Sequence, residues 1–243
     1  MNNPPVLPIV AILCGGAGTR LREQTQSIPK PLVEIGGRPI LWHVIKIYLA
    51  QGFSDFLLLT GFRAELIEDF VDSERWPGGV RIRCLETGAD TPTGGRLRRA
   101  SEALEGDETV CVTYADGVAD IDLRRLLDHH RGQEAPATMT VVRPELPFGV
   151  AELNGDGAVR AFQEKPRSEY WINGGFFCFE PGVLRSVGPD DVLEREPLER
   201  LAAAGQLQAF RHEGFWGCMD TYKDAVALNE LWASGRAPWN LWS

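Results

Sequence analysis

The residues of this chain best suited to chemistry begin with a glycine-rich stretch. Gly15, Gly16 and Gly18 occupy three of four positions, directly after an apolar run at residues 7–13 that predicts a buried strand. A glycine turn at a strand end can place backbone N–H groups around phosphate oxygens. A structural turn with exposed basic neighbours is the alternative.

Two familiar phosphate loops do not fit the spacing of this turn. Counted from Gly15, the second glycine of an ATPase P-loop is replaced by Arg20. Counted from Gly16 and Gly18, the third glycine of a dinucleotide loop is replaced by Leu21. The polar residues that follow also delay any helix, and so the turn belongs to a longer loop.

A lysine downstream extends this loop. Lys30 stands between Pro29 and Pro31, which restrict its backbone and suit a cation held in place. Together with Arg20, Lys30 supplies two cations beside the glycine turn. This combination favours a triphosphate over a single phosphate.

Two aspartates are candidate Mg²⁺ ligands, since hard cations prefer carboxylate oxygens. Asp116 follows the apolar run 109–114, which predicts a strand, and ligands bind at such strand ends in open α/β sheets. Asp220 precedes the last predicted helix, at residues 222–234. Either aspartate could instead cap a helix, and the spacing leaves open whether the two converge.

A third group of residues lies in the second half of the chain. Lys165 precedes Pro166 and resembles Lys30 in its restricted backbone. Asn173, Gly174 and Gly175 interrupt a predicted strand, where missing side chains allow a ligand close to the backbone. A β-bulge is the alternative explanation of these glycines.

Regularly alternating elements position these residues. Strands are predicted at 7–13, 55–60, 80–86 and 109–114, and helices at 39–53, 64–71, 95–104 and 122–131. Four successive strand–helix units predict a parallel sheet covered on both faces. Closely spaced strands follow at 137–142, 149–153, 158–165 and 170–179, with a hairpin turn at 154–157. We therefore expect an α/β fold in one domain over residues 1–243, a mixed, mainly parallel sheet with an inserted antiparallel portion.

Composition narrows the class of function. A formal net charge of −9 argues against nucleic acid or an anionic membrane as the main partner. The start of the chain has no basic segment typical of a secretory signal, and no apolar run approaches the roughly 18 residues that span a bilayer. Five widely spaced cysteines without a CxxC pair predict neither a disulfide framework nor a zinc site. We expect a cytoplasmic protein.

The motifs in this order resemble the sugar-1-phosphate nucleotidylyltransferases. The resemblance rests on LCGGAGTRL, PKPLVEIGGRPIL, YADG, FQEKP and INGGFF, and it runs from about residue 8 to the C-terminus. The stretches TPTGGRLRRA, GFWGCMDT and LWASGRAPW are most similar to the cytidylyl-transferring branch. The resemblance implies a Rossmann-like nucleotide-diphospho-sugar transferase fold, with a nucleotide-binding N-terminal half and a sugar-phosphate-binding C-terminal half.

The resemblance also implies a role for each matching residue. The nucleotide would be bound by Leu13, Gly15, Gly16, Gly18, Thr19, Thr93, Gly94 and Arg96. The sugar phosphate would be bound by Gly149, Glu164, Lys165 and Asn173. Catalysis would rest on Arg20, Lys30 and Asp116, and Mg²⁺ would be bound by Asp116 and Asp220.

The implied reaction joins a sugar 1-phosphate to an NTP, giving a nucleotide sugar and pyrophosphate. CTP and glucose 1-phosphate are the favoured substrates, with CDP-glucose as product, in a homo-oligomeric enzyme. The sugar phosphate is already ionised at neutral pH, so that positioning and charge neutralisation suffice without a general base.

The chain departs from the pattern of this branch in two places, which leaves alternative substrates open. Ala115 stands where the branch usually has glycine, and the segment between Val71 and Thr91 is shorter. In that branch the longer segment helps close the nucleotide site and reaches a neighbouring subunit. Another NTP or sugar 1-phosphate is therefore an alternative, as is a non-catalytic regulatory relative that binds nucleotide sugars.

Overall fold

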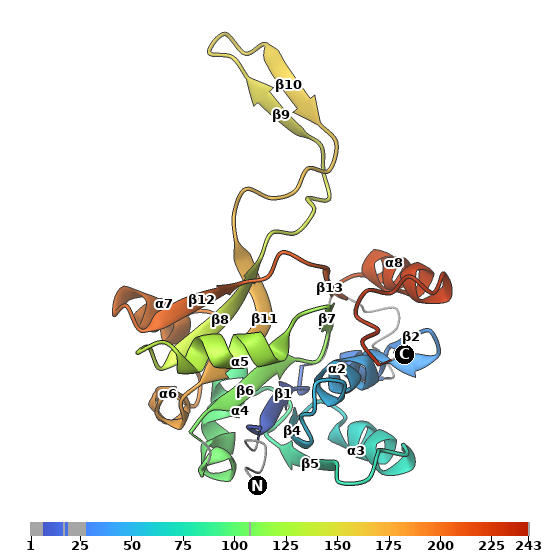
Figure 1. Cartoon of the computed structure of the whole chain (residues 1–243), viewed down its shortest axis with the longest axis vertical. Helices are drawn as coiled ribbons and strands as arrows, with labels where there is room; N and C mark the ends of the chain where they lie inside the picture. The colour runs from blue at the N-terminus through green and yellow to red at the C-terminus, as the bar shows by residue number, and fades with distance from the viewer. Residues whose placement is uncertain (1–6, 17, 19–27, 107, 243) are drawn as a thin grey trace, which may run out of the picture.

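The protein is built around a seven-stranded mixed sheet (Figure 1). The structure is a computed structural model that describes residues 7–16, 18, 28–106 and 108–242. The strand order across the sheet is β12 (Leu207–Arg211), β8 (Ala137–Val142), β11 (Ile172–Phe179), β6 (Val110–Tyr114), β1 (Val10–Leu13), β4 (Asp55–Thr60) and β5 (Arg81–Glu86).

Strand direction divides the sheet as expected. The neighbours β6, β1, β4 and β5 are parallel. In chain order, helical crossovers join β1 to β4, β4 to β5 and β5 to β6, as parallel pairing requires. β11 runs antiparallel to both β6 and β8, whereas β12 is parallel to β8. The predicted α/β class with a mainly parallel, mixed sheet is confirmed, and the sheet draws strands from both halves of the chain.

Helices pack on both faces because successive residues of a buried strand point to opposite sides. In β1, Val10 and Ile12 belong to one hydrophobic cluster and Ala11 and Leu13 to the other. The first cluster contains residues of α2 (Ile40–Leu49), α3 (Ala64–Ser73), α5 (Leu123–Arg131) and α8 (Tyr222–Ala233). The second contains residues of α4 (Thr93–Ala100), α6 (Pro181–Ser186) and α7 (Glu196–Ala203).

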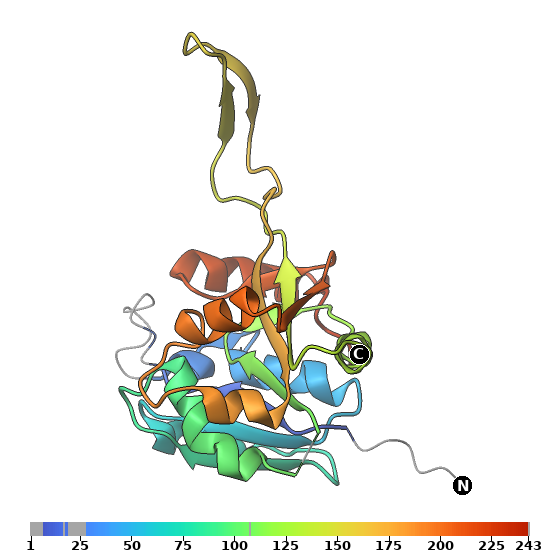
Figure 2. The ribbon, with the colours of Figure 1, turned by 90° about the vertical axis from the view of Figure 1, so that its left-hand side faces the viewer.

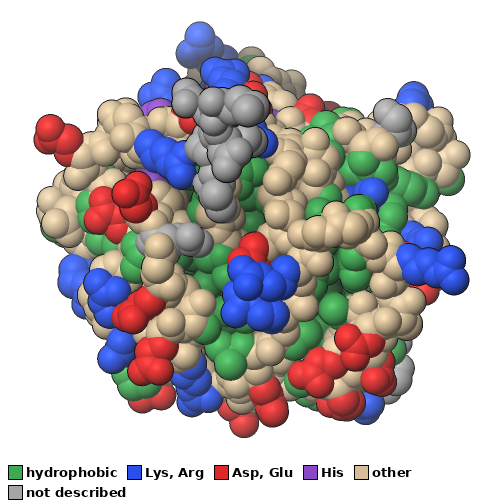
Figure 3. Space-filling model, turned by 60° about the horizontal axis from the view of Figure 1, so that its bottom comes forward, with side chains coloured by type: hydrophobic (Ala, Val, Ile, Leu, Met, Phe, Trp, Pro, Cys, Tyr) green, Lys and Arg blue, Asp and Glu red, His purple; other side chains and the backbone are tan. Residues whose placement is uncertain are grey.

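Short elements connect these layers. The 3-10 segments are Lys30–Leu32 and Ser101–Leu104, and the small antiparallel pairs are β2 (Glu34–Ile35) with β3 (Arg38–Pro39) and β7 (Gly117–Ala119) with β13 (Trp216–Cys218). Among the described residues no helix is long and apolar enough to span a bilayer. On the face seen in Figure 3, Lys and Arg side chains are scattered among Asp and Glu side chains.

The predicted hairpin forms, but outside the main sheet. β9 (Val150–Leu153) and β10 (Val159–Gln163) pair only with each other and project away from the body of the molecule (Figures 1 and 2). A bridge between Glu145 and Arg167 marks the base of this projection. We call residues 145–167 the arm.

Candidate active site

A pocket of about 410 Å³ opens at the sheet edge where β1 and β6 end. Leu13 pairs with Tyr114 in the register of these parallel strands, so the glycine turn after β1 and Asp116 after β6 lie at the same edge. Nine predicted residues line this first pocket: Leu13, Gly15, Gly16, Gly18, Lys30, Thr93, Arg96, Asp116 and Asp220. The structure thus gathers most of the predicted nucleotide and metal residues.

Arg96 fastens the glycine turn to the neighbouring strands. Its side chain is 3% exposed although it reaches the pocket wall. The guanidinium donates to Gly15 O at 2.9 Å, to Thr60 O at 3.0 Å and to Gly88 O at 2.8 Å. It also donates to Ala89 O and to the hydroxyl of Thr87. Arg96 therefore holds the ends of three segments, which is a positioning role beside the predicted nucleotide contact.

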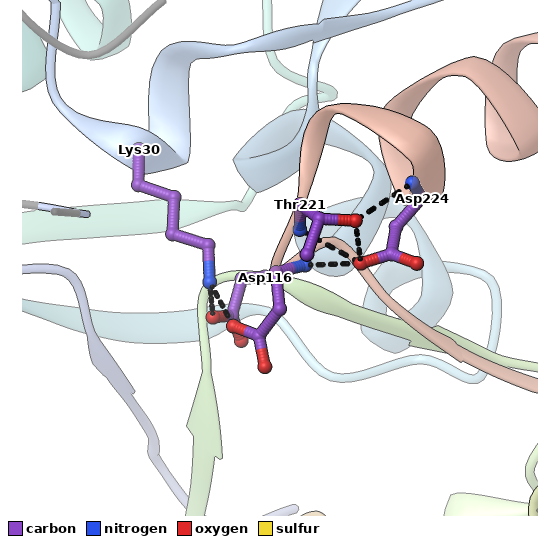
Figure 4. A network of polar contacts seen from close by, with 5 residues as sticks. Lys30, Asp116, Thr221 and Asp224 are labelled. Carbon is purple, nitrogen blue, oxygen red and sulfur yellow. Dashed lines mark hydrogen bonds and ion pairs between the residues drawn. The ribbon is translucent and has the colours of Figure 1, made fainter. Parts of the chain in front are cut away.

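Lys30 extends between the two predicted metal ligands (Figure 4). Its Nζ lies 2.5 Å from Asp116 Oδ2 and 2.7 Å from Asp220 Oδ1. Burial alone would lower the pKa of Lys30, but the charge and hydrogen bonds of the two carboxylates outweigh it and raise that pKa. The ammonium is therefore charged at neutral pH.

The convergence of the two aspartates follows from the pairing of β13 with β7. Cys218 pairs with Gly117, and the Met219 amide donates to Asp116 O at 2.9 Å. Asp220 does not cap α8: the N-cap of that helix is Thr221, whose side chain forms a reciprocal capping box with Asp224 (Figure 4). The carboxylate of Asp220 thus remains directed to Lys30.

The donor set at this point fits a hard cation. Asp116, Cys218 and Asp220 each offer a ligand atom, and these atoms lie within 4.8 Å of one another. Burial, and then the charges of Asp116 and Asp220, raise the pKa of the Cys218 thiol. Its soft sulfur suits a hard cation less than a carboxylate oxygen does. The two carboxylates are the ligand type that Mg²⁺ prefers, and they already accept one cation, the ammonium of Lys30.

A second pocket of about 250 Å³ adjoins the first and shares Tyr114, Asp116 and Asp220 with it. Asn173 and the two glycines after it line this second pocket. The register of β11 against β8 shifts between Asn173 and Phe177, and Gly175 has φ +81°, so the glycines form an irregularity in the strand. The β-bulge interpretation is therefore confirmed. The same irregularity lines the second pocket, and the approach of a ligand to this backbone stays a prediction.

The remaining predicted residues lie elsewhere. Gly94 is buried in α4, where a Cβ would come 2.6 Å from Asp191 O, and it lines neither pocket. Gly149, Glu164 and Lys165 are exposed on the arm and also line neither pocket. Thr19 and Arg20 fall outside the described residues.

Several lining residues escaped the sequence analysis. Among them, Tyr114 lines both pockets, and Trp216 and Cys218 line the second. Trp216 Nε1 donates to Gly174 O at 2.8 Å and so supports the pocket wall. Tyr114 and Cys218 each stand two positions before a predicted aspartate, which is the signal that could have identified them.

Comparisons with known proteins agree with this geometry. The family described as Nucleotidyl transferase matches residues 9–216. A glucose-1-phosphate cytidylyltransferase from Salmonella typhimurium is 40% identical, over 95% of this chain and 98% of its own length. A probable glucose-1-phosphate cytidylyltransferase from Bacillus subtilis is also 40% identical, with the same coverage.

More distant proteins share the architecture. A mannose-1-phosphate guanyltransferase from Hypocrea jecorina is 32% identical over 92% of this chain and 64% of its own length. Among solved structures, HddC from Yersinia pseudotuberculosis, complexed with GMP-PN, superposes with a TM-score of 0.75. It covers 93% of this chain and 100% of its own at 21% identity, which is a likeness of fold.

Proposed function

Because this chain belongs to the nucleotidyl transferase family, we propose that it transfers a cytidylyl group from CTP to glucose 1-phosphate. The products are CDP-glucose and pyrophosphate. The observation that carries the proposal is the position of Lys30, which meets both aspartates where the two pockets join. The choice of substrates is supported by the 40% identity, over nearly the full length, to proteins named for that activity.

The two adjoining pockets suit a reaction between two phosphates. The triphosphate occupies the first pocket, where Gly16 leaves room beside the backbone, and the sugar phosphate occupies the second, beside Asn173. An ionised oxygen of the sugar phosphate forms a bond to the α-phosphorus in line with the bond that breaks. Pyrophosphate leaves with that electron pair, and no proton has to be removed from the nucleophile.

Lys30 stabilises the charge that develops in this step. Its ammonium is buried enough for a strong interaction yet lines the first pocket, and we infer that it exchanges its carboxylate partners for the α-phosphate when the substrates bind. Arg20 and Thr19 complete the phosphate contacts in the proposal. Arg96 acts by holding the glycine turn in position.

Mg²⁺ is the cofactor in this proposal, bound by Asp116 and Asp220. It supplies neutralisation of phosphate charge and helps align the triphosphate. The support is the chemistry of the donor set, two carboxylates that already converge on a cation.

We further propose that the protein is a homo-oligomer in which the arm contacts a second copy. Phe148 is 74% exposed and Phe162 is 64% exposed. In the pairing of β9 with β10, the residues Ala151, Leu153, Val159 and Phe162 share one face, since cross-strand partners point to the same side. A lone hairpin is marginally stable in water, so an unpartnered apolar face of this kind favours a protein contact.

Charge also favours a second copy as the occupant. The arm carries four acidic and three basic side chains, whereas the whole chain has a net charge of −9. Because the arm is nearly neutral, its apolar face can approach another acidic copy with little electrostatic repulsion. Lys165 and Glu164 lie on the arm, and their proposed contact with sugar phosphate requires the arm to approach a pocket, its own or that of the second copy. A cytoplasmic location is proposed as well, since all five cysteines are free.

The test is a pyrophosphate-release screen that combines four NTPs with several sugar 1-phosphates in the presence of Mg²⁺. We expect the highest kcat/KM for CTP with glucose 1-phosphate. A different preferred pair would correct the substrates and keep the reaction. Absence of release with every pair, combined with measurable binding of a nucleotide sugar, would favour the non-catalytic alternative.

A further inference from the structure

A carboxylate outside both pockets links their walls. Glu194 lies just before α7 and lines neither pocket. Its Oε1 accepts a hydrogen bond from the Tyr114 hydroxyl, and its Oε2 accepts one from Thr93 Oγ1 at 2.7 Å. Thr93 lines the first pocket, and Tyr114 lines both. No signal in the motifs pointed to Glu194, because its partners are about 80 and 100 residues away.

The carboxylate of Glu194 determines whether the Thr93 hydroxyl can donate or accept a hydrogen bond in the first pocket. A hydroxyl has one hydrogen and two lone pairs. An ionised carboxylate can only accept, so Thr93 must donate its one hydrogen to Glu194. The Leu193 amide donates to the same oxygen at 2.9 Å and uses one lone pair. One lone pair remains, and toward the first pocket Thr93 is therefore an acceptor only.

A second series of hydrogen bonds runs from Glu194 through Tyr114 to Asn173 in the second pocket. The Tyr114 hydroxyl donates its one hydrogen to Glu194 Oε1, since the carboxylate can only accept. Its oxygen accepts from Asn173 Nδ2 at 3.2 Å, and Asn173 Oδ1 accepts from the Gly175 amide at 2.8 Å. These two contacts orient the amide group of Asn173. One N–H of Asn173 remains for a ligand in the second pocket.

We propose that Glu194 is a positioning residue that sets the hydrogen-bond polarity of both pockets, making Thr93 an acceptor on the nucleotide side and orienting the Asn173 amide on the sugar side. This inference rests on the proposed function. It predicts that the nucleotide presents a hydrogen-bond donor to Thr93. Two parts of CTP carry such a donor, the amino group of the base and the hydroxyls of the ribose, and the test below separates them.

Glu194→Gln is the informative variant because it keeps shape and removes the charge. The glutamine oxygen can accept from one hydroxyl, but its NH₂ group can only donate. Either Thr93 or Tyr114 must then reverse its hydroxyl. Glu199→Gln, which alters an exposed glutamate on α7, is the matched control.

The experiment measures kcat/KM for CTP, UTP and dCTP with glucose 1-phosphate, and the Tm of each variant. We expect Glu194→Gln to lower the preference for CTP over one competitor by about tenfold or more, since a mispaired polar group is rejected strongly. A change against UTP assigns the donor to the base, and a change against dCTP assigns it to the ribose 2′-hydroxyl. Thr93→Val should give the same loss, and the double variant should add nothing further.

The effect on the second pocket is measured as the KM for glucose 1-phosphate. Tyr114→Phe should raise the KM for glucose 1-phosphate and leave nucleotide preference unchanged, because Thr93 keeps its bond to Glu194. In Glu194→Gln, a nucleotide preference within twofold of the wild type together with an unchanged KM for glucose 1-phosphate would overturn the inference, as would an equal loss for all nucleotides with a lowered Tm. If the wild type releases no pyrophosphate with any pair, the proposed function fails. Calorimetric binding of CTP, UTP and dCTP to the wild type and to Glu194→Gln then still decides the polarity.

Discussion

Gly15 and Arg96 occupy adjoining space: a Cβ on Gly15 would lie 1.9 Å from Arg96 Nη1. Gly15 also accepts a hydrogen bond from that guanidinium through its carbonyl oxygen. The first glycine of the turn is therefore required by a buried cation. For Gly16, the next residue, no described atom outside its chain neighbours lies within 4 Å of the Cβ position.

This contrast predicts different outcomes for two alanine substitutions. Gly15→Ala should displace the Arg96 guanidinium and leave several buried carbonyls unpaired, at a cost of about 1–3 kcal/mol for each. Thermal unfolding should show a Tm lowered by several degrees, since each kcal/mol shifts the Tm of a chain of this length by about 2–4 °C. Gly16→Ala, the stability control, should keep the wild-type Tm. Equal Tm values for the two variants would contradict the packing of Arg96.

Asp116→Asn and Asp220→Asn test the metal site. Each substitution keeps the shape of the side chain and removes one of the two charges that converge on Lys30. We expect turnover to fall by about a hundredfold or more in either variant while the circular dichroism spectrum stays native. Aspartates on the surface, such as Asp69, serve as controls. Wild-type pyrophosphate release from either variant would refute the two-aspartate site.

Lys30→Met separates the two roles of the lysine. The ammonium is the cation that these carboxylates hold in the structure, so its removal should let them bind Mn²⁺ more tightly, as measured by titration without substrates. Turnover should nevertheless fall, because the charge on the α-phosphate loses its partner. A rise in KM with unchanged kcat would instead mean that Lys30 contributes uniform binding.

We expect self-association of the protein to depend on the apolar face of the arm. Leu153→Asp and Val159→Asp place charges on that face, whereas Glu152→Gln changes the opposite face. Sedimentation should show weaker self-association for the two aspartate variants and wild-type behaviour for Glu152→Gln. A wild-type protein that sediments as a monomer at all accessible concentrations would exclude the second copy as the occupant of this face.

We expect the free energy of unfolding to fall in acid because His43 is buried as a neutral ring. It is fully buried, donates to Ile35 O through Nε2, and accepts from Trp239 Nε1 through Nδ1, an arrangement that needs the neutral ring. Burial lowers the pKa of His43 to about 4 from a value of 6.5 when exposed. The unfolded state therefore binds the proton first as the pH falls, and stability decreases between pH 6.5 and about 4.

Denaturant unfolding at pH 7 and pH 5 measures this effect. The contribution of His43 to the free energy of unfolding should shrink by about 2 kcal/mol between these values. His43→Gln can still donate and accept but does not titrate, and its stability should change less over the same range. A parallel pH dependence of both proteins would assign the acid sensitivity to other groups.

Local patterns in the sequence predicted most of the elements that carry the site. The apolar runs ending at Leu13 and Tyr114 became neighbouring parallel strands, and the residues that follow them therefore met at one edge. The hairpin at 154–157 formed because its turn signal needs only adjacent residues. Residue type and short-range spacing were also enough to indicate phosphate and carboxylate chemistry.

Contacts between distant segments could not be inferred from these patterns. Asp116 and Asp220 converge only because β13 packs against β7, and the saturated hydrogen bonds of Arg96 depend on the ends of three segments meeting. The sequence by itself thus determined the order of most strands and helices and which residue types were candidates to bind phosphate. The tertiary structure decided which of them share a pocket, left Lys165 outside on the arm, and placed Glu194 between Thr93 and Tyr114, since only packing brings together groups about 100 residues apart.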